Sequence, residues 1–188
     1  MPTFQSYFQF TAQTRTLSAF MRLHSRSESF NSDLSDRLPI VVFMAFTIES
    51  YINSIGYRLV PDWMTKERKR WSWKIDRLHS TVGKKADWKS VELISVSELF
   101  DIRDRIAHGK PEYVHGPDFA TFNEAKEYLQ NFEPEPPWLK AVDENWIVNS
   151  REKLERILRY LAEAANLHSS DYLHSATGRV LANEDSDA

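Results

Sequence analysis

Apolar residues recur along most of this chain at alternating steps of four and three positions, the spacing of one face of an α-helix. The longest stripe predicts a helix over Ser35 to Gly56, with Asp36 able to cap its start and Pro39 in its first turn. The apolar positions of this stripe are Leu34, Leu38, Val41, Ala45, Ile48, Ile52, Ile55 and Leu59. No segment alternates cleanly between apolar and polar residues over more than a few positions, so the pattern gives little indication of strands.

Shorter stripes predict further helices. One begins at Trp71 and is closed by Gly83, and another runs over Ser90 to Ala107 and is closed by Gly109 and Pro111. A less sharply bounded helix is predicted around residues 17–24. A last helix carries its stripe at Leu154, Leu158, Leu161 and Ala165, with Asn149 and Glu152 spaced like a capping box at its start.

Proline residues cluster in the segment between the last two of these helices. Five of them, at positions 111, 117, 134, 136 and 137, fall within residues 110–141, which we interpret as an insertion with a short helix near Asn123 to Gln130. The acidic tail, residues 183–188, is predicted to be disordered. We therefore predict a single all-α domain over residues 1–182, folded as an antiparallel helical bundle with a Pro-rich insertion before the last helix.

Composition narrows the classes of function. The net charge of −3 excludes a protein coated in positive charge, so any RNA site must be a local basic patch. The chain has no cysteine, no apolar run near the ~20 residues of a membrane helix, and no secretory signal at its start. These features favour a cytoplasmic protein with no membrane partner.

The segment from Arg103 to His108 carries the most distinctive chemistry. An arginine can hold a phosphate in a fork of donors, and a histidine can move a proton near neutral pH. On a helical wheel of ~100° per residue, Arg103 falls on the apolar face and diverges from His108 by ~140°. A cation on that face needs an acidic partner or a cleft, and Glu49 is a candidate partner. A histidine before Gly109 is also an ordinary helix ending, because the helix dipole favours a cation there.

The same segment resembles the signature of the HEPN family, in which an arginine, a polar residue and a histidine end a helix. Here these are Arg103, Asp104 and His108, within a sequence that ends IAHGKP. The preceding helix, FTIESYINSIG at Phe46 to Gly56, also looks like the core helix of that family. The resemblance covers roughly residues 35–111, together with the last helix as a bundle partner.

The resemblance implies an all-helical bundle and a symmetric homodimer whose two motif helices meet at a cleft. Active HEPN proteins cleave RNA without a metal, often in toxin or phage-defence systems in which a protein partner can neutralise them. On that model His108 moves the proton of the ribose 2′-OH, Arg103 steadies the phosphate, and Asp104 orients the histidine or the substrate. We add Arg105, Lys110 and Trp73 as candidate substrate-binding residues. Other HEPN proteins are non-catalytic modules, so a helical dimer that binds RNA, a nucleotide or a protein partner is the alternative hypothesis.

Two further clusters contain side chains that could bind a ligand. Basic residues from Lys66 to Lys74 surround Trp71 and Trp73, which suits single-stranded RNA but also suits a solvated helix face with Trp71 in the core. His168, Asp171 and His174 contain metal-ligand side chains, although nothing in their spacing fixes a coordination geometry. No Gly-rich phosphate loop or His-Glu-x-x-His motif appears, so we predict no metal and no cofactor.

Overall fold

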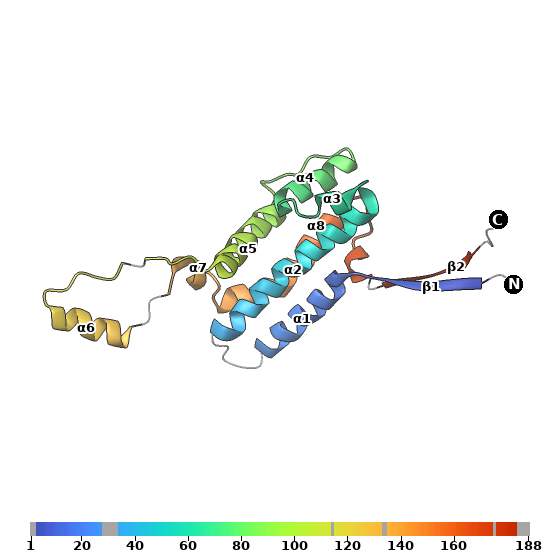
Figure 1. The fold of residues 1–188 in the computed structure, drawn as a ribbon. Coiled ribbons are helices and arrows are strands. Elements are labelled where there is room, and N and C mark those ends of the chain that lie inside the picture. Colours follow the sequence, from blue (N-terminus) through green and yellow to red (C-terminus); the bar gives the residue numbers. More distant parts are fainter. Residues whose placement is uncertain (1–2, 28–33, 114, 133–134, 175, 184–188) are drawn as a thin grey trace.

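Four long helices form the body of the protein, and a thin extension leaves the body at each end (Figure 1). The computed structural model describes residues 3–27, 34–113, 115–132, 135–174 and 176–183. The long helices are α1 (Ala12–Ser27), α2 (Leu34–Leu59), α5 (Val91–His108) and α8 (Glu144–Ala164). The shorter elements are β1 (Thr3–Phe10), α3 (Trp63–Lys66), α4 (Trp71–Thr81), α6 (Phe122–Asn131), α7 (Pro137–Lys140), the 3₁₀ turn η1 (Asp171–Leu173) and β2 (Ala176–Asn183). The all-α helical bundle predicted from the apolar stripes is confirmed.

Helix α2 is the centre of the bundle and contacts α1, α4, α5 and α8. The middle of its predicted apolar stripe, from Val41 to Ile55, is fully inaccessible to solvent, whereas Leu38 and Leu59 are half-buried. Gly56, near the predicted end of this helix, lies inside α2, which runs on to Leu59. Glycine is required there because a Cβ would overlap the ring of Trp63. The segment Arg37–Leu59 is long and apolar enough to span a membrane, and half of its most apolar stretch is buried within the bundle, as in a core helix.

Helix α5 has a clear start and a clear end, and both follow from local chemistry. The Ser90 side chain accepts a hydrogen bond from the Leu93 backbone N–H, which satisfies one of the free donors at the helix N-terminus. At the other end Gly109 adopts a left-handed conformation with φ of 51° and donates its N–H to the Arg105 carbonyl. The predicted helix is thus confirmed to within one residue, and His108 is its last residue.

The predicted start of one helix and the predicted cap of another were wrong. Helix α8 begins at Glu144 rather than near Asn149, because the Asp143 carboxylate accepts the Trp146 N–H at 2.7 Å and caps the helix a turn and a half earlier. The buried residue Ile147 extends the apolar stripe back to that point. Helix α2 begins at Leu34, so Asp36 is its third residue and not its cap.

A two-stranded antiparallel ribbon joins the ends of the chain and was not predicted. Strand β1 pairs with β2 over eight residues, from Thr3 opposite Asn183 to Phe10 opposite Ala176. The partners are far apart in sequence, so no local pattern marks the pairing. Asn183, which we had assigned to a disordered tail, is the last residue of β2, and residues 184–188 lie outside the described part.

The Pro-rich insertion forms an arm that extends away from the bundle (Figure 1). The predicted short helix within it is confirmed as α6, which starts with a capping box between Thr121 and Glu124. No residue of α6 is buried. At the base of the arm the Trp138 indole N–H donates to Glu112, which links the two ends of the insertion, and Trp138 packs against the hydrophobic core of the bundle. The arm therefore lies beside the end of α5 at its base and leaves the rest of that end open.

Candidate functional site

The end of helix α5 and the segment after it form an open groove of about 390 Å³, which we call the α5 groove. The exposed residue His108 lies in it, one turn after Asp104. The charges in the groove are mixed, with three carboxylates against two permanent cations. Its lining residues are Asp101, Asp104, Arg105, His108, Lys110 and Glu112. Four of the six residues that we predicted from the sequence as site residues are therefore brought together here.

Glu112 fixes one wall of the α5 groove. Its carboxylate accepts from the Arg105 guanidinium at 2.8 Å through one oxygen and from the Trp138 indole at 3.1 Å through the other. A second open groove of about 520 Å³ adjoins this wall and is also lined by Arg105 and Lys110. The base of the insertion therefore helps to shape the site and does not cover it.

Arg103 lies outside the α5 groove, in what we call the Glu49 cluster. Its Nη2 atom is 3.6 Å from Glu49 Oε2, its Nε atom is 3.3 Å from Asp104 Oδ1, and its guanidinium lies 4.8 Å from the Phe100 ring centroid. The other Glu49 oxygen is 3.6 Å from the ammonium of Lys74, a buried lysine. The expected pairing of Arg103 with Glu49 is confirmed.

The contacts of Arg103 are loose. The distances from Arg103 and from Lys74 to Glu49 both exceed ordinary hydrogen-bond lengths. Arg103 Nε is a buried donor with no hydrogen-bond partner. The Arg103 side chain retains 21% of its accessible surface. Arg103 and His108 diverge as the helical wheel predicts, and a single chain does not bring them into one groove. Asp104 connects the two, since it lines the α5 groove and contacts Arg103.

Trp73 does not reach the α5 groove. It is 36% exposed and stacks on Trp63 of α3 with 6.4 Å between ring centroids. Trp71, in contrast, is buried and stacks on Phe100 at 4.7 Å, which confirms that it belongs to the core stripe. The basic residues Arg68, Lys69 and Arg70 are exposed on the segment between α3 and α4.

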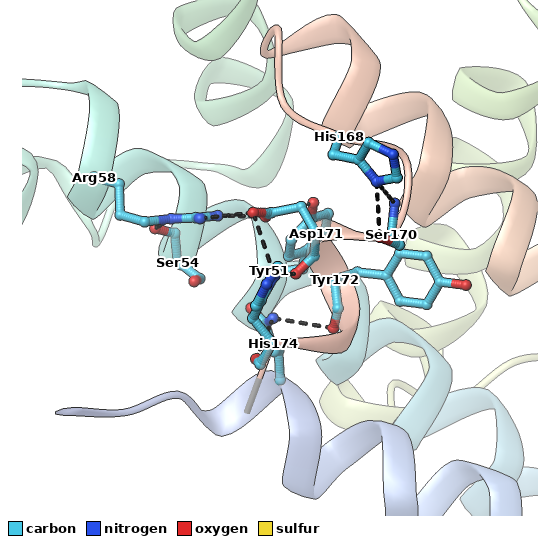
Figure 2. A network of polar contacts seen from close by, with 9 residues as sticks. Tyr51, Ser54, Arg58, His168, Ser170, Asp171, Tyr172 and His174 are labelled. Atoms are coloured by element: carbon cyan, nitrogen blue, oxygen red, sulfur yellow. Dashed lines mark hydrogen bonds and ion pairs between the residues drawn. The ribbon is translucent and has the colours of Figure 1, made fainter. Parts of the chain in front are cut away.

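A second ionic cluster lies where η1 contacts α2, and sequence reasoning did not find it (Figure 2). Asp171 accepts two hydrogen bonds from Arg58, at 2.8 and 2.6 Å, and one from the Tyr51 hydroxyl at 3.0 Å. The Arg58 guanidinium holds the pKa of Asp171 below its ordinary value of 3.8, and burial together with the Asp171 charge raises the pKa of Tyr51. We call this the Asp171 cluster, and its groups are saturated with partners within the chain.

The residues considered for a metal site contact different partners. His168 Nδ1 lies 2.8 Å from the Ser170 hydroxyl, whereas Asp171 is engaged by Arg58 and Tyr51. His174 Nδ1 lies 3.7 Å from Asp171 Oδ1, and Figure 2 shows His168 and His174 on opposite sides of the turn. Within the described residues, no three histidine, aspartate or glutamate side chains gather closely enough to hold a metal ion.

Comparison with known proteins gives no relative. No family model matches the chain, and neither a curated protein nor a solved structure matches it significantly.

Proposed function

We propose that the protein is a HEPN-like, metal-independent endoribonuclease that acts as a homodimer in the cytoplasm. The observation that carries the proposal is the α5 groove, where an exposed histidine lies among three carboxylates and two cations at the end of a well-defined helix. An imidazole that a substrate can reach is able to take or give a proton.

In the proposed reaction the phosphorus of the scissile phosphodiester is transferred from the 5′-oxygen of the next nucleotide to the neighbouring ribose 2′-oxygen. His108 removes the 2′-OH proton, the 2′-oxygen attacks phosphorus, and the bond to the 5′-oxygen breaks with a proton delivered to the leaving oxygen. Asp104 orients the imidazole or the substrate, while Lys110 and Arg105 hold neighbouring phosphates. The products are a 2′,3′-cyclic phosphate and a free 5′-OH, and no oxidant, reductant or metal is required.

Two copies of the chain make the reaction complete. One copy offers a single His108, whereas base and acid act on opposite sides of the phosphorus, and a two-fold axis supplies the second histidine. In this arrangement Arg103 turns its guanidinium to the phosphate, where it stabilises the added negative charge. Its long contacts to Glu49 are weak competitors for such a bidentate interaction.

One observation favours the alternative of a non-catalytic module that binds RNA or a protein partner. Arg103 is paired with Glu49 and Asp104 and is absent from the groove that holds His108. A neutralising protein partner is part of either proposal, because the open α5 groove with its alternating charges can accept a complementary protein surface.

The two candidates are separated by a single substitution. We expect His108→Ala to reduce cleavage of single-stranded RNA by about 10²–10⁴-fold, the usual contribution of a positioned proton carrier. Chelators should leave cleavage unchanged. His115→Ala is the matched control, since His115 is also an exposed histidine, seven residues further on in the insertion and outside the α5 groove. Undiminished cleavage by the His108 variant would show that the activity does not depend on the α5 groove, and binding of RNA without cleavage by the unaltered protein would establish the alternative.

A further inference from the structure

A pocket of about 390 Å³ opens where the start of α1 meets α2 and α3, and we call it the Trp63 pocket. None of the residues of the α5 groove lines it. Its wall combines polar side chains, among them Thr11 and Asn53, with the larger side chains of Tyr57, Trp63 and Met64. Tyr57 and Met64 are more than half exposed and form its rim.

Three buried polar atoms with no hydrogen-bond partner belong to residues of this wall. They are Thr11 Oγ1, Asn53 Oδ1 and Trp63 Nε1, which make up half of the six such side-chain atoms among the described residues. Buried polar groups without a partner cost free energy, so three of them in the wall of one pocket favour the binding of a molecule that can pair with them.

Trp63 cannot relieve its own unpaired N–H. The residue is 3% exposed, and its ring lies flat on the backbone of α2 at Gly56, where even a Cβ would overlap it. Trp73 stacks on the ring as well. The indole donor is therefore held in a fixed direction by packing on its own protein, which is the condition of a preorganised binding group.

The pattern of the unpaired atoms selects the chemistry of the ligand. The indole N–H can only donate, the Asn53 oxygen accepts, and the Thr11 hydroxyl does either. A complementary ligand offers an acceptor close to a donor, as the edge of a nucleobase does. The exposed rim side chains Tyr57 and Met64 supply apolar contact for a planar ring.

Charge next to the pocket adds a second requirement. Glu67 lines the pocket, and it is followed at once by the exposed cations Arg68, Lys69 and Arg70. A base in the pocket would carry its ribose phosphate toward this basic segment, and such a segment beside aromatic rings suits a nucleotide chain.

We propose that the Trp63 pocket binds a nucleobase, either of a free nucleotide or of an unpaired residue of single-stranded RNA. The three unpaired atoms are buried, so binding of the base requires side chains of the pocket wall to move. This proposal is independent of cleavage at the α5 groove, because the two sites share no residue.

The test is isothermal titration calorimetry of the full chain with AMP, GMP, CMP and UMP, with ribose 5-phosphate as the probe lacking a base. We expect at least one nucleotide to bind with a millimolar or lower Kd and ribose 5-phosphate not to bind. Trp63→Phe and Asn53→Leu should each weaken that binding by about tenfold, the effect of one lost hydrogen bond in a dry site. Trp88→Phe is the matched control, since the Trp88 N–H already donates to Asp76 at 2.9 Å, outside the pocket.

Stability separates a binding role from a structural one. Thr11→Val removes an unpaired hydroxyl with little change in volume and should leave the melting temperature unchanged or raise it, whereas Trp63→Phe also loses buried ring contacts and should lower it. If Trp63→Phe fails to fold, Thr11→Val, which removes only a hydroxyl, takes its place. Titration of the protein with a short single-stranded RNA under the same conditions identifies the source of the base. Tighter binding of the RNA than of the free nucleotides indicates an unpaired RNA residue, and the reverse indicates a free nucleotide. The proposal is overturned if no nucleotide or RNA binds at millimolar concentration, if ribose 5-phosphate binds equally well, or if the pocket variants bind like the Trp88 control.

Discussion

Helix α2 takes part in two ion-pair clusters that differ in how completely their carboxylate is satisfied. In the Asp171 cluster every contact to Arg58 and Tyr51 is 3.0 Å or shorter, and the carboxylate is almost fully buried. In the Glu49 cluster the two cations lie 3.6 Å away and the carboxylate keeps 31% of its surface. The first has the geometry of a group that holds two elements together, and the second leaves its outer cation, Arg103, available to a ligand.

Connectivity explains the difference between the two clusters. Asp171 reaches α2 from the turn after the last helix, 113 residues away from Arg58, and attaches the end of the chain to the core. Glu49 contacts Lys74 and Arg103 on neighbouring helices that already pack against α2 through apolar residues. The bundle therefore depends on the Asp171 cluster for a connection, whereas Glu49 mainly neutralises the buried Lys74.

The largest expected effect comes from removing the charge of Asp171. Asp171→Asn should lower the free energy of unfolding by about 3 kcal/mol, because it leaves Arg58 and Tyr51 without their acceptor. The value lies at the lower end for a buried pair, since Arg58 is 37% exposed. Urea denaturation measures it, and a loss below about 1 kcal/mol would show that the cluster holds nothing together.

The pH dependence of stability gives an independent measure of the same cluster. The pKa of Asp171 is lowered in the folded protein, so its contribution is present above the ordinary value of 3.8 and is lost as the pH falls through the folded value. The pKa of Tyr51 is raised, so its contribution is complete below the ordinary value of 10.0 and is lost as the pH rises through the folded value.

Tyr51→Phe isolates the alkaline half of this behaviour. The variant should be less stable than the unaltered protein at neutral pH by about 1 kcal/mol, the usual net value of one hydrogen bond. Above pH 10.0 the gap between the two should close, because only the unaltered protein has a hydroxyl to ionise. Urea titrations at neutral pH and in the alkaline range provide the comparison. A gap that stays constant with pH would mean that the hydroxyl is not held protonated by the cluster.

Sequence reasoning named Glu49 as a candidate partner of Arg103 but missed the Asp171 cluster, and the difference has a physical reason. Arg103 falls on an apolar face of a helix, so the wheel alone shows that it needs an acid, and Glu49 is the carboxylate near the apolar face of the neighbouring helix. The end of α5 is equally local, since Ser90 and Gly109 cap it through residues three or four positions away. Periodicity cannot reveal the Arg58–Asp171 pair or the β1–β2 ribbon, because their partners meet only after the bundle has formed.

The smallest effect on stability is expected for Arg103, and it decides what the Glu49 cluster is for. Arg103→Gln removes a partly exposed cation with long contacts, while Glu49 remains to neutralise Lys74. The free energy of unfolding should therefore fall by less than about 1 kcal/mol. If Arg103 stabilises the phosphate in cleavage, the same variant should lose about 10²-fold or more in RNA cleavage, because a donor aimed at developing charge is worth far more than a loose ion pair. A loss of stability as large as that of the Asp171 variant, with cleavage reduced only in proportion to unfolded protein, would make Arg103 a structural residue like Arg58.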